Sequence, residues 1–208
     1  MKAIVFDLGG VILPLNRPRA EAAFRSLSAQ GSAGNHPFDR AYAALLDDGF
    51  FDRFEKGQIS GQEFLGTLAR LAGSDEADVR TVWQTILEPI PPENLIALAK
   101  LAKSYPLYLL SNTNALHMEW IFSHVDQAHG RPLFAGIFQH LFLSYEMRMR
   151  KPEPIIYHTV VEHVGLKPAD LMFVDDHPEN VQAARVAGWQ AVLHPANAAL
   201  ELTVQTWF

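Results

Sequence analysis

The chain begins with a short apolar run that stops at a carboxylate and two glycines. Residues 3–6 are Ala-Ile-Val-Phe, and Asp7, Gly9 and Gly10 follow closely. An apolar run this short is typical of a strand buried on both faces of a parallel sheet. Ligands of such sheets gather at the carboxyl ends of the strands, so Asp7 is either a site residue or merely the start of a turn. The two glycines would let the backbone approach a ligand closely.

The next seventy or so residues show helical rather than strand periodicity. Ser60 and Glu63 form a capping box, and Phe64 and Leu68 follow at helical spacing. The prolines within residues 89–92 cannot continue a helix and mark a boundary. The pattern therefore predicts an all-helical domain over residues 16–88, with helices at 20–28, 41–54, 61–72 and 77–87 and a flexible connection at 31–37.

From residue 89 onward, apolar runs alternate with amphipathic segments. Such alternation predicts a parallel sheet with helices on both faces, and hence the α/β class. We expect an irregular segment at residues 125–136. The remaining predicted elements are strands at 107–110, 141–143, 171–174 and 190–193, and helices at 93–104, 115–124, 154–164 and 178–187.

Composition excludes several classes of function. The 208 residues carry a formal net charge of −6, which argues against a nucleic-acid-binding surface. The chain has no cysteine, so disulfides, zinc–thiolate sites and thiol nucleophiles are excluded. No apolar stretch reaches the length of a membrane span, and the N-terminus lacks the features of a signal peptide. We expect a cytoplasmic protein without a nucleic-acid or membrane partner, either monomeric or a homodimer, with Trp207 and Phe208 docked on the domain or in a dimer contact.

Polar side chains follow several of the predicted strands at the point where each strand ends. Because parallel strands of one sense end at the same edge of a sheet, these groups can converge there. Taken singly, each could be a helix N-cap or a solvated charge. Carboxylates brought this close need a cation, and oxygen ligands with open positions suit Mg²⁺. The residues are Asp7, Ser111 and Asn112, Lys151, and Asp175 and Asp176.

In their order along the chain, these residues resemble the four motifs of the haloacid dehalogenase superfamily. The predicted helical insert corresponds to the cap that follows the first motif in that superfamily. The chain is most similar to the helical-cap branch, and within it to bacterial α-D-glucose-1-phosphate phosphatase-like members. The matching strings are Asp7-Leu8-Gly9-Gly10-Val11, Leu110-Ser111-Asn112, Lys151-Pro152, and Phe173-Val174-Asp175-Asp176 followed by Asn180.

The resemblance implies a Mg²⁺-dependent phosphatase that acts on a small phosphorylated metabolite, most simply a sugar phosphate. Asp7 would be the nucleophile and would form an aspartyl-phosphate. Mg²⁺ would be held by Asp7, the main-chain carbonyl of Gly9 and Asp176, with Asp175 in support of this shell.

The resemblance also assigns residues to the phosphoryl group. Ser111 and the main chain of Asn112 would bind its oxygens, and Lys151 would stabilise its charge. Asn180 would orient the lysine or the loop of its own motif.

One position departs from the family pattern. Most phosphatases of this superfamily carry a second Asp two residues after the nucleophile, where this chain has Gly9. That Asp acts as general acid and base, which is commonly worth about 10²–10⁴ in rate. Three explanations stay open. In the first, the leaving group needs little protonation, as in a sugar 1-phosphate or an acyl or aryl phosphate. In the second, Asp175, His177, a cap residue or a water takes the place of the missing acid. In the third, catalysis is vestigial and only phosphate binding remains.

Two rival functions follow from the same residues. A 2-haloacid dehalogenase would share Asp7 and Lys151 but needs no metal, and it carries a Tyr where this chain has Gly9. The paired carboxylates would repel a halo-carboxylate unless they held a metal. The other rival, a weakly active or non-catalytic phosphate-binding protein, would bind the metal without turnover.

The expected architecture is a Rossmann-like three-layer core with an inserted helical cap. The core would comprise residues 1–15 and 89–208, with strand order 5-4-1-2-3 and the nucleophile strand at the centre. The cap, residues 16–88, would close over the strand ends and exclude water. Its candidate substrate-facing parts are residues 49–51 and 55–60.

Overall fold

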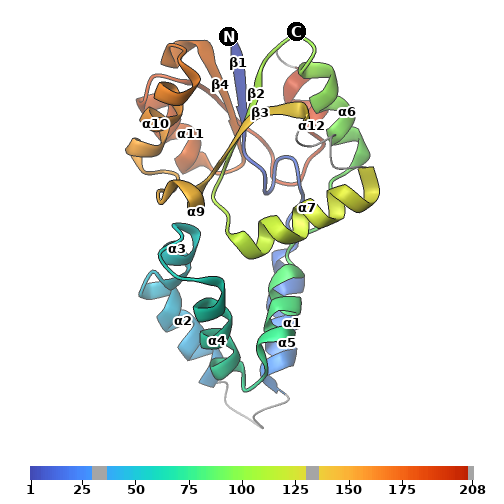
Figure 1. Ribbon diagram of the computed structural model, residues 1–208, viewed down its shortest axis with the longest axis vertical. Coiled ribbons are helices and arrows are strands. Elements are labelled where there is room, and N and C mark those ends of the chain that lie inside the picture. Colours follow the sequence, from blue (N-terminus) through green and yellow to red (C-terminus); the bar gives the residue numbers. More distant parts are fainter. Residues whose placement is uncertain (30–36, 130–135, 206–208) are drawn as a thin grey trace.

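The computed structural model describes residues 1–29, 37–129 and 136–205, and in it five parallel strands form one sheet. Their order is β3-β2-β1-β4-β5, which is the predicted order read from the opposite edge. The strand that precedes Asp7, β1, is therefore central, as expected, and Figure 1 shows it between β2 and β4. The strands are β1 (Ala3–Phe6), β2 (Leu107–Ser111), β3 (Phe138–Leu143), β4 (Leu171–Asp175) and β5 (Gln190–Leu193).

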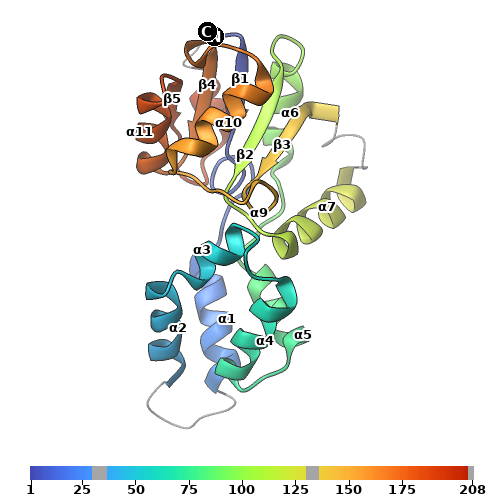
Figure 2. The same ribbon diagram turned by 60° about the vertical axis from the view of Figure 1, so that its left-hand side comes forward.

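Helices cover both faces of this sheet because its strands present apolar side chains in both directions. Ile4 and Phe6 pack with α6 (Pro92–Leu101), α7 (Ala115–His129) and α12 (Leu200–Val204) on one face. Ala3 and Val5 pack with α10 (Pro154–Val164) and α11 (Pro178–Val186) on the other. Figures 1 and 2 show the resulting three layers.

Five helices between β1 and α6 form a separate unit, called here the helical unit. Its aromatic centre includes Phe50, Phe54 and Phe64, and Leu116 of α7 joins this cluster from the sheet side. Figures 1 and 2 show the unit beyond the carboxyl ends of the strands. Its helices are α1 (Arg17–Ala29), α2 (Pro37–Asp47), α3 (Phe50–Glu55), α4 (Gly61–Ala72) and α5 (Glu76–Gln84).

The chain passes between the sheet and the helical unit along two adjacent segments. Leu15 and Leu87 form an antiparallel bridge, and the Asn16 amide donates to the Ile86 carbonyl at 2.7 Å. The two passages thus form a short hydrogen-bonded ribbon rather than two loose linkers.

Several predicted elements differ from those observed. The helix expected over residues 41–54 is wrong, because Gly49, with φ 69°, separates α2 from α3. The irregular segment expected from residue 125 is wrong as far as residue 129, where α7 continues. The helix expected to residue 87 ends at Gln84, and two short helices, α9 (Ser144–Met147) and α12, were not expected. The predicted connection 31–36 and the C-terminal pair Trp207 and Phe208 lie outside the described residues.

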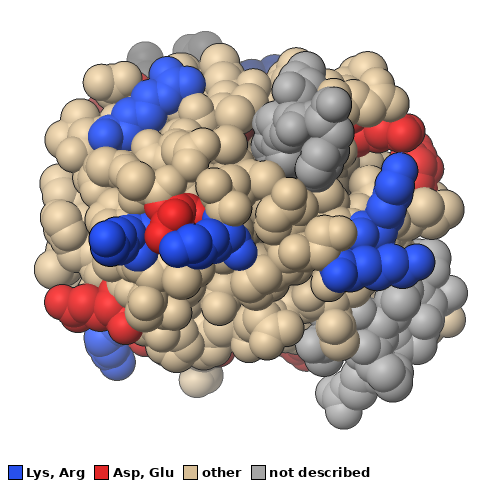
Figure 3. Space-filling model, turned by 90° about the horizontal axis from the view of Figure 1, so that it is seen from above, with Lys and Arg blue, Asp and Glu red and all other residues tan. Residues whose placement is uncertain are grey.

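Two surface features bear on membrane and nucleic-acid partners. Within the described ranges, no helix combines the length and the apolarity that a membrane crossing requires. On the end of the molecule opposite the helical unit, Lys and Arg side chains lie in small separate groups, some beside acidic side chains (Figure 3). The described basic residues on this face therefore do not join into a continuous patch of the kind that nucleic acid would need.

Candidate active site

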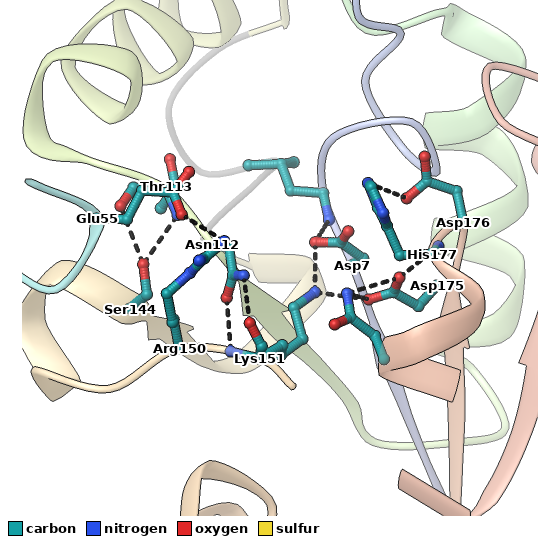
Figure 4. Close-up of polar contacts among 12 residues, drawn as sticks. Asp7, Glu55, Asn112, Thr113, Ser144, Arg150, Lys151, Asp175, Asp176 and His177 are labelled. Atoms are coloured by element: carbon teal, nitrogen blue, oxygen red, sulfur yellow. Dashed lines mark hydrogen bonds and ion pairs between the residues drawn. The ribbon is translucent and has the colours of Figure 1, made fainter. Parts of the chain in front are cut away.

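The predicted site residues converge at the carboxyl edge of the sheet. Asp7 directly follows β1, and Ser111 and Asp175 are the last residues of the two strands that flank it. Lys151 comes from the segment between α9 and α10 and is buried. Figure 4 shows Asp7, Lys151 and Asp175 pointing toward one another.

Lys151 lies between two carboxylates. Its Nζ is 2.9 Å from Asp7 Oδ1 and 2.7 Å from Asp175 Oδ2. Burial lowers the pKa of Lys151, but the charges of Asp175 and Asp7 outweigh burial and raise it overall. The lysine is therefore a permanent cation in this site.

One lysine does not balance the carboxylates around it. Burial raises the pKa of Asp7 to about 7; Lys151 opposes this rise and Asp175 adds to it. Burial also raises the pKa of Asp176, and Asp175 contributes in the same direction. The site thus favours a second positive charge when its carboxylates are ionised.

The residues fit a hard divalent cation. One carboxylate oxygen each of Asp7, Asp175 and Asp176 lies within 4.8 Å of the others. Asp176 Oδ1 is buried and accepts no hydrogen bond from the residues that the structure describes. Gly10, at φ 78°, lies so close that a Cβ there would be 2.2 Å from Asp176 Oδ2. An unsatisfied carboxylate oxygen beside two further carboxylates suits Mg²⁺.

Asp175 is occupied by donors from the protein. Its Oδ1 accepts from the His177 amide at 2.7 Å and from Asn180 Nδ2 at 3.0 Å. Its Oδ2 accepts from Lys151 Nζ at 2.7 Å and also from Asn180 at 3.0 Å. Asn180 and Lys151 thus donate to the same carboxylate, and the role of Asn180 in orienting the lysine stays a prediction.

Asn112 positions the lysine with its side chain. The Lys151 amide donates to Asn112 Oδ1 at 2.8 Å, and Asn112 Nδ2 donates to the Lys151 carbonyl at 2.9 Å. Ser144 Oγ likewise accepts from the Thr113 amide and donates to the Thr113 carbonyl. Sequence reasoning considers only the main chain of Asn112 and misses Ser144, because both contacts join segments more than thirty residues apart in the chain.

These groups open on a cavity of about 1010 Å³ between the sheet edge and the helical unit. Of the predicted residues, Asp7, Gly9, Ser111, Asn112, Lys151 and Asn180 line it, whereas Asp175 and Asp176 do not. The helical unit contributes Phe51 and Glu55 from the two predicted substrate-facing stretches, and also Trp83.

Arg150 connects the two walls of this cavity. Its guanidinium pairs with Asp52 Oδ1 at 2.5 Å and Glu55 Oε2 at 3.1 Å, both on α3. A second ion pair joins Lys56 to Glu153. Sequence reasoning gave a role to Lys151 but none to the neighbouring Arg150, because no local pattern indicates that Arg150 contacts α3.

Gly9 has an apolar neighbour in place of an acid. A Cβ at Gly9 would lie 2.9 Å from Leu15 Cδ1, so the Leu15 side chain fills the space that a residue 9 side chain would enter. The other candidates for the missing acid are differently placed: the Asp175 carboxylate is fully hydrogen-bonded, and His177 Nε2 is 3.9 Å from Asp176 Oδ1 on a largely exposed ring.

Comparisons with known proteins show the family to which this chain is related. Residues 1–188 match the family described as haloacid dehalogenase-like hydrolase. The chain is 32% identical to the D-ribitol-5-phosphate phosphatase of Bacteroides thetaiotaomicron, over 98% of each chain. A haloacid dehalogenase family enzyme of the same organism, solved with magnesium and inorganic phosphate, superposes with a TM-score of 0.83 at 32% identity over 95% of this chain and 96% of that one.

A more distant solved structure is that of a 2-haloacid dehalogenase. The 2-haloacid dehalogenase of Pseudomonas syringae has a TM-score of 0.66 and 18% identity over the whole of both chains, which shows a common fold alone. The family match, by contrast, covers most of the sequence, and the related phosphatase matches almost its full length. The chain belongs to the haloacid dehalogenase-like hydrolases.

Proposed function

We propose that this protein is a Mg²⁺-dependent phosphatase that hydrolyses a small phosphomonoester, a sugar or sugar-alcohol phosphate. The observation that carries the proposal is the buried lysine shared by Asp7 and Asp175 beside an unsatisfied Asp176 oxygen. A nucleophilic carboxylate, a fixed cation and a set of oxygen ligands for a metal ion are what attack on a phosphate dianion requires. The related D-ribitol-5-phosphate phosphatase supports the substrate class.

The reaction has two displacements at phosphorus. A carboxylate oxygen of Asp7 forms a bond to phosphorus while the bond to the ester oxygen breaks, and the departing alkoxide takes a proton from solvent. Water then attacks the phosphorus of the aspartyl-phosphate, loses a proton, and releases inorganic phosphate and the Asp7 carboxylate. Ser111 and the Asn112 main chain bind the phosphoryl oxygens, and Lys151 stabilises their charge in both steps.

Asp7, Asp176 and the carbonyl of Gly9 would hold Mg²⁺, with Asp175 behind them. The ion would neutralise phosphoryl charge so that two anions can approach each other. Asp175, whose oxygens already accept from Lys151, Asn180 and the His177 amide, supports this arrangement rather than leading it.

The helical unit would act as a cap over this site. We assign residues 16–88 to the cap and residues 1–15 and 89–208 to the core. Arg150 and Glu153 on the core meet three partners on the cap side, and this favours a closed arrangement around substrate. Phe51, Glu55 and Trp83 would then contact the organic part of the substrate.

The test is phosphate release from D-ribitol 5-phosphate, sugar 1-phosphates, sugar 6-phosphates and an aryl phosphate. Each is assayed with Mg²⁺ and with a chelator, for the wild type, Asp7→Asn, and Asp170→Asn as a control at the far end of β4. We expect turnover that requires both Mg²⁺ and Asp7 and survives Asp170→Asn. Mg²⁺ binding without turnover of any substrate would refute catalysis and support the phosphate-binding alternative.

A further inference from the structure

An asparagine far from the family motifs holds the loop that follows the nucleophile. Asn197 lies in the segment between β5 and α12. Its amide donates to the Gly10 carbonyl at 2.8 Å. Its side chain accepts from the Leu15 amide at 2.9 Å through Oδ1 and donates to the Leu15 carbonyl at 3.0 Å through Nδ2. Both ends of the loop 10–15 are thus tied to one residue 182 positions beyond Leu15.

The backbone of Asn197 suits this task. Its φ is 62°, in the left-handed region, and the only other described residue besides glycine with positive φ is Arg148. Asn enters this region more readily than most residues, and Gly enters it freely. The amide can therefore face Gly10 while the side chain reaches Leu15, and few residue types could supply both contacts.

The loop that Asn197 holds is part of the candidate metal site. Gly9, whose carbonyl is a proposed ligand, lies next to Gly10, and Gly10 is packed directly against the Asp176 carboxylate. Leu15 packs against Gly9 at the other end and begins the passage to the helical unit. A shift of either end would move Gly9 relative to Asp176.

We infer that Asn197 is a positioning residue that fixes the loop 10–15 so that the carbonyl of the adjoining Gly9 and the Asp176 carboxylate share one metal ion. The inference rests on the proposed function, because it assumes the proposed ligands. Residues that orient metal ligands typically affect metal affinity or activity by about 10–100-fold when they are removed.

A purely structural role predicts a different result. Asn197 is exposed, so water can replace its lost partners, and removing it should cost little stability. Asn94 offers a matched comparison, because its side chain also makes two hydrogen bonds in this region, from Nδ2 to the Ile12 carbonyl and from the Leu200 amide to Oδ1. Asn94 is buried, so its loss should be the more destabilising of the two.

The decisive variants are Asn197→Gly, Asn197→Asp and Asn94→Ala. The first keeps the left-handed backbone but deletes the side chain, and the second keeps the oxygen that accepts from Leu15. The full chain is titrated with Mg²⁺ by calorimetry, its melting temperature is measured in chelator, and amide exchange is followed at Leu15.

We expect Asn197→Gly to weaken Mg²⁺ binding about tenfold and to lower kcat more than it raises KM, with faster exchange at Leu15 and a nearly unchanged melting temperature. Asn197→Asp should recover part of the affinity. Asn94→Ala, which releases the middle of the loop at Ile12 rather than its two ends, should melt lower than Asn197→Gly but weaken Mg²⁺ binding less.

Three results would overturn the inference. The inference fails if Asn197→Gly keeps wild-type Mg²⁺ affinity, and it fails if the affinities of the variants simply follow their melting temperatures. If the wild type binds Mg²⁺ and hydrolyses phosphates but Asn197→Gly is indistinguishable from it, this inference alone fails. If the wild type binds no Mg²⁺, the inference fails together with the proposed function.

Discussion

The Lys151 ammonium and the Asp175 carboxylate are 2.7 Å apart, and both side chains are completely enclosed by protein. A buried ion pair of this kind adds little net stability, because desolvation of both charges offsets their attraction. Its value here is orientation: the lysine is held against Asp7 before any substrate binds. The ion pair therefore holds a positive charge beside Asp7, where a phosphoryl group would bind, and the lysine does not have to move during the reaction.

Replacing Lys151 separates its effect on catalysis from its effect on the metal. Lys151→Met should lower phosphate hydrolysis at least about 10²-fold, as removal of other preorganised electrostatic groups does. It should also tighten Mg²⁺ binding, because the carboxylates of Asp7 and Asp175 lose their only close cation among the described residues. Calorimetry gives the affinity and phosphate release gives the rate.

The control is Lys100→Met, which removes an exposed charge from the last turn of α6. It should leave both the rate and the Mg²⁺ affinity near those of wild type. Weaker Mg²⁺ binding in Lys151→Met would contradict the charge argument.

The two ion-pair contacts with the helical unit should differ in importance. Arg150 bridges Asp52 and Glu55, and burial raises the pKa of Glu55, so loss of the arginine leaves a poorly solvated acid at the cavity wall. Arg150→Gln should therefore raise KM by about fivefold to tenfold, since a charge left unpaired costs more than about 1 kcal/mol. Steady-state kinetics at low and high salt measure this effect.

Lys56→Gln is the matched control for Arg150→Gln, because it removes the other ion pair between the helical unit and the core. The Lys56–Glu153 pair is partly exposed, and pairs of this kind contribute about 0–1 kcal/mol. KM should rise less than it does in Arg150→Gln and should depend less on salt than in wild type. Equal effects of the two substitutions would count against a special role for Arg150.

Much of the sheet could be predicted from the sequence because its signals are local. The apolar run at residues 3–6 and the polar residues that end each strand are short patterns, and parallel strands bring those ends to one edge. The capping box at Ser60 similarly located the start of α4, where its side chain accepts from the Glu63 amide at 3.1 Å.

The remaining features depend on contacts between distant segments. Nothing local to Arg150 indicates that α3 will meet it, and Asn112 positions a lysine 39 residues away. Gly49 was the exception, because it could have signalled the break between α2 and α3 but lay inside an otherwise helical pattern. The residues that support the site were therefore the hardest to find.

His117 should make stability depend on pH. Burial lowers its pKa to about 4, partly opposed by the Trp83 carbonyl. Asn114 Nδ2 lies 3.2 Å from Nδ1, an arrangement that suits a neutral ring. In the unfolded chain the ring has a pKa of about 6.5, so it binds a proton below that pH. In the folded chain the ring stays neutral down to about pH 4. The free energy of unfolding should therefore fall as pH drops through this window.

The contribution of His117 falls by about 2 kcal/mol between pH 8 and pH 5, because the unfolded ring titrates near pH 6.5 and each of the roughly 1.5 pH units below that value costs about 1.4 kcal/mol. Urea unfolding of wild type and His117→Gln across this range isolates it. The variant should gain stability relative to wild type as pH falls. Parallel pH curves for the two proteins would show that the ring is protonated equally in both states.

The apolar surroundings of Gly9 make the rate sensitive to the leaving group. Leu15 fills the space where the family's general acid would project, so the departing oxygen has no acid from residue 9. Because general acid–base help is worth about 10²–10⁴, aryl phosphates and sugar 1-phosphates should turn over faster than alkyl phosphates by an amount approaching this range. Rates for a series of phosphates of differing leaving-group pKa measure the slope.

Supplying an acid should flatten that slope. In Gly9→Asp combined with Leu15→Ala, the shorter residue 15 makes room for a carboxyl group near the leaving oxygen. The control is Gly9→Asn combined with Leu15→Ala, which has the same shape but donates no acidic proton. If the Asp variant speeds alkyl phosphates and the Asn variant does not, the missing acid limits the wild-type rate. If wild type shows no dependence on the leaving group, another residue or a water already protonates the departing oxygen, and the lack of an acid at residue 9 has no kinetic cost.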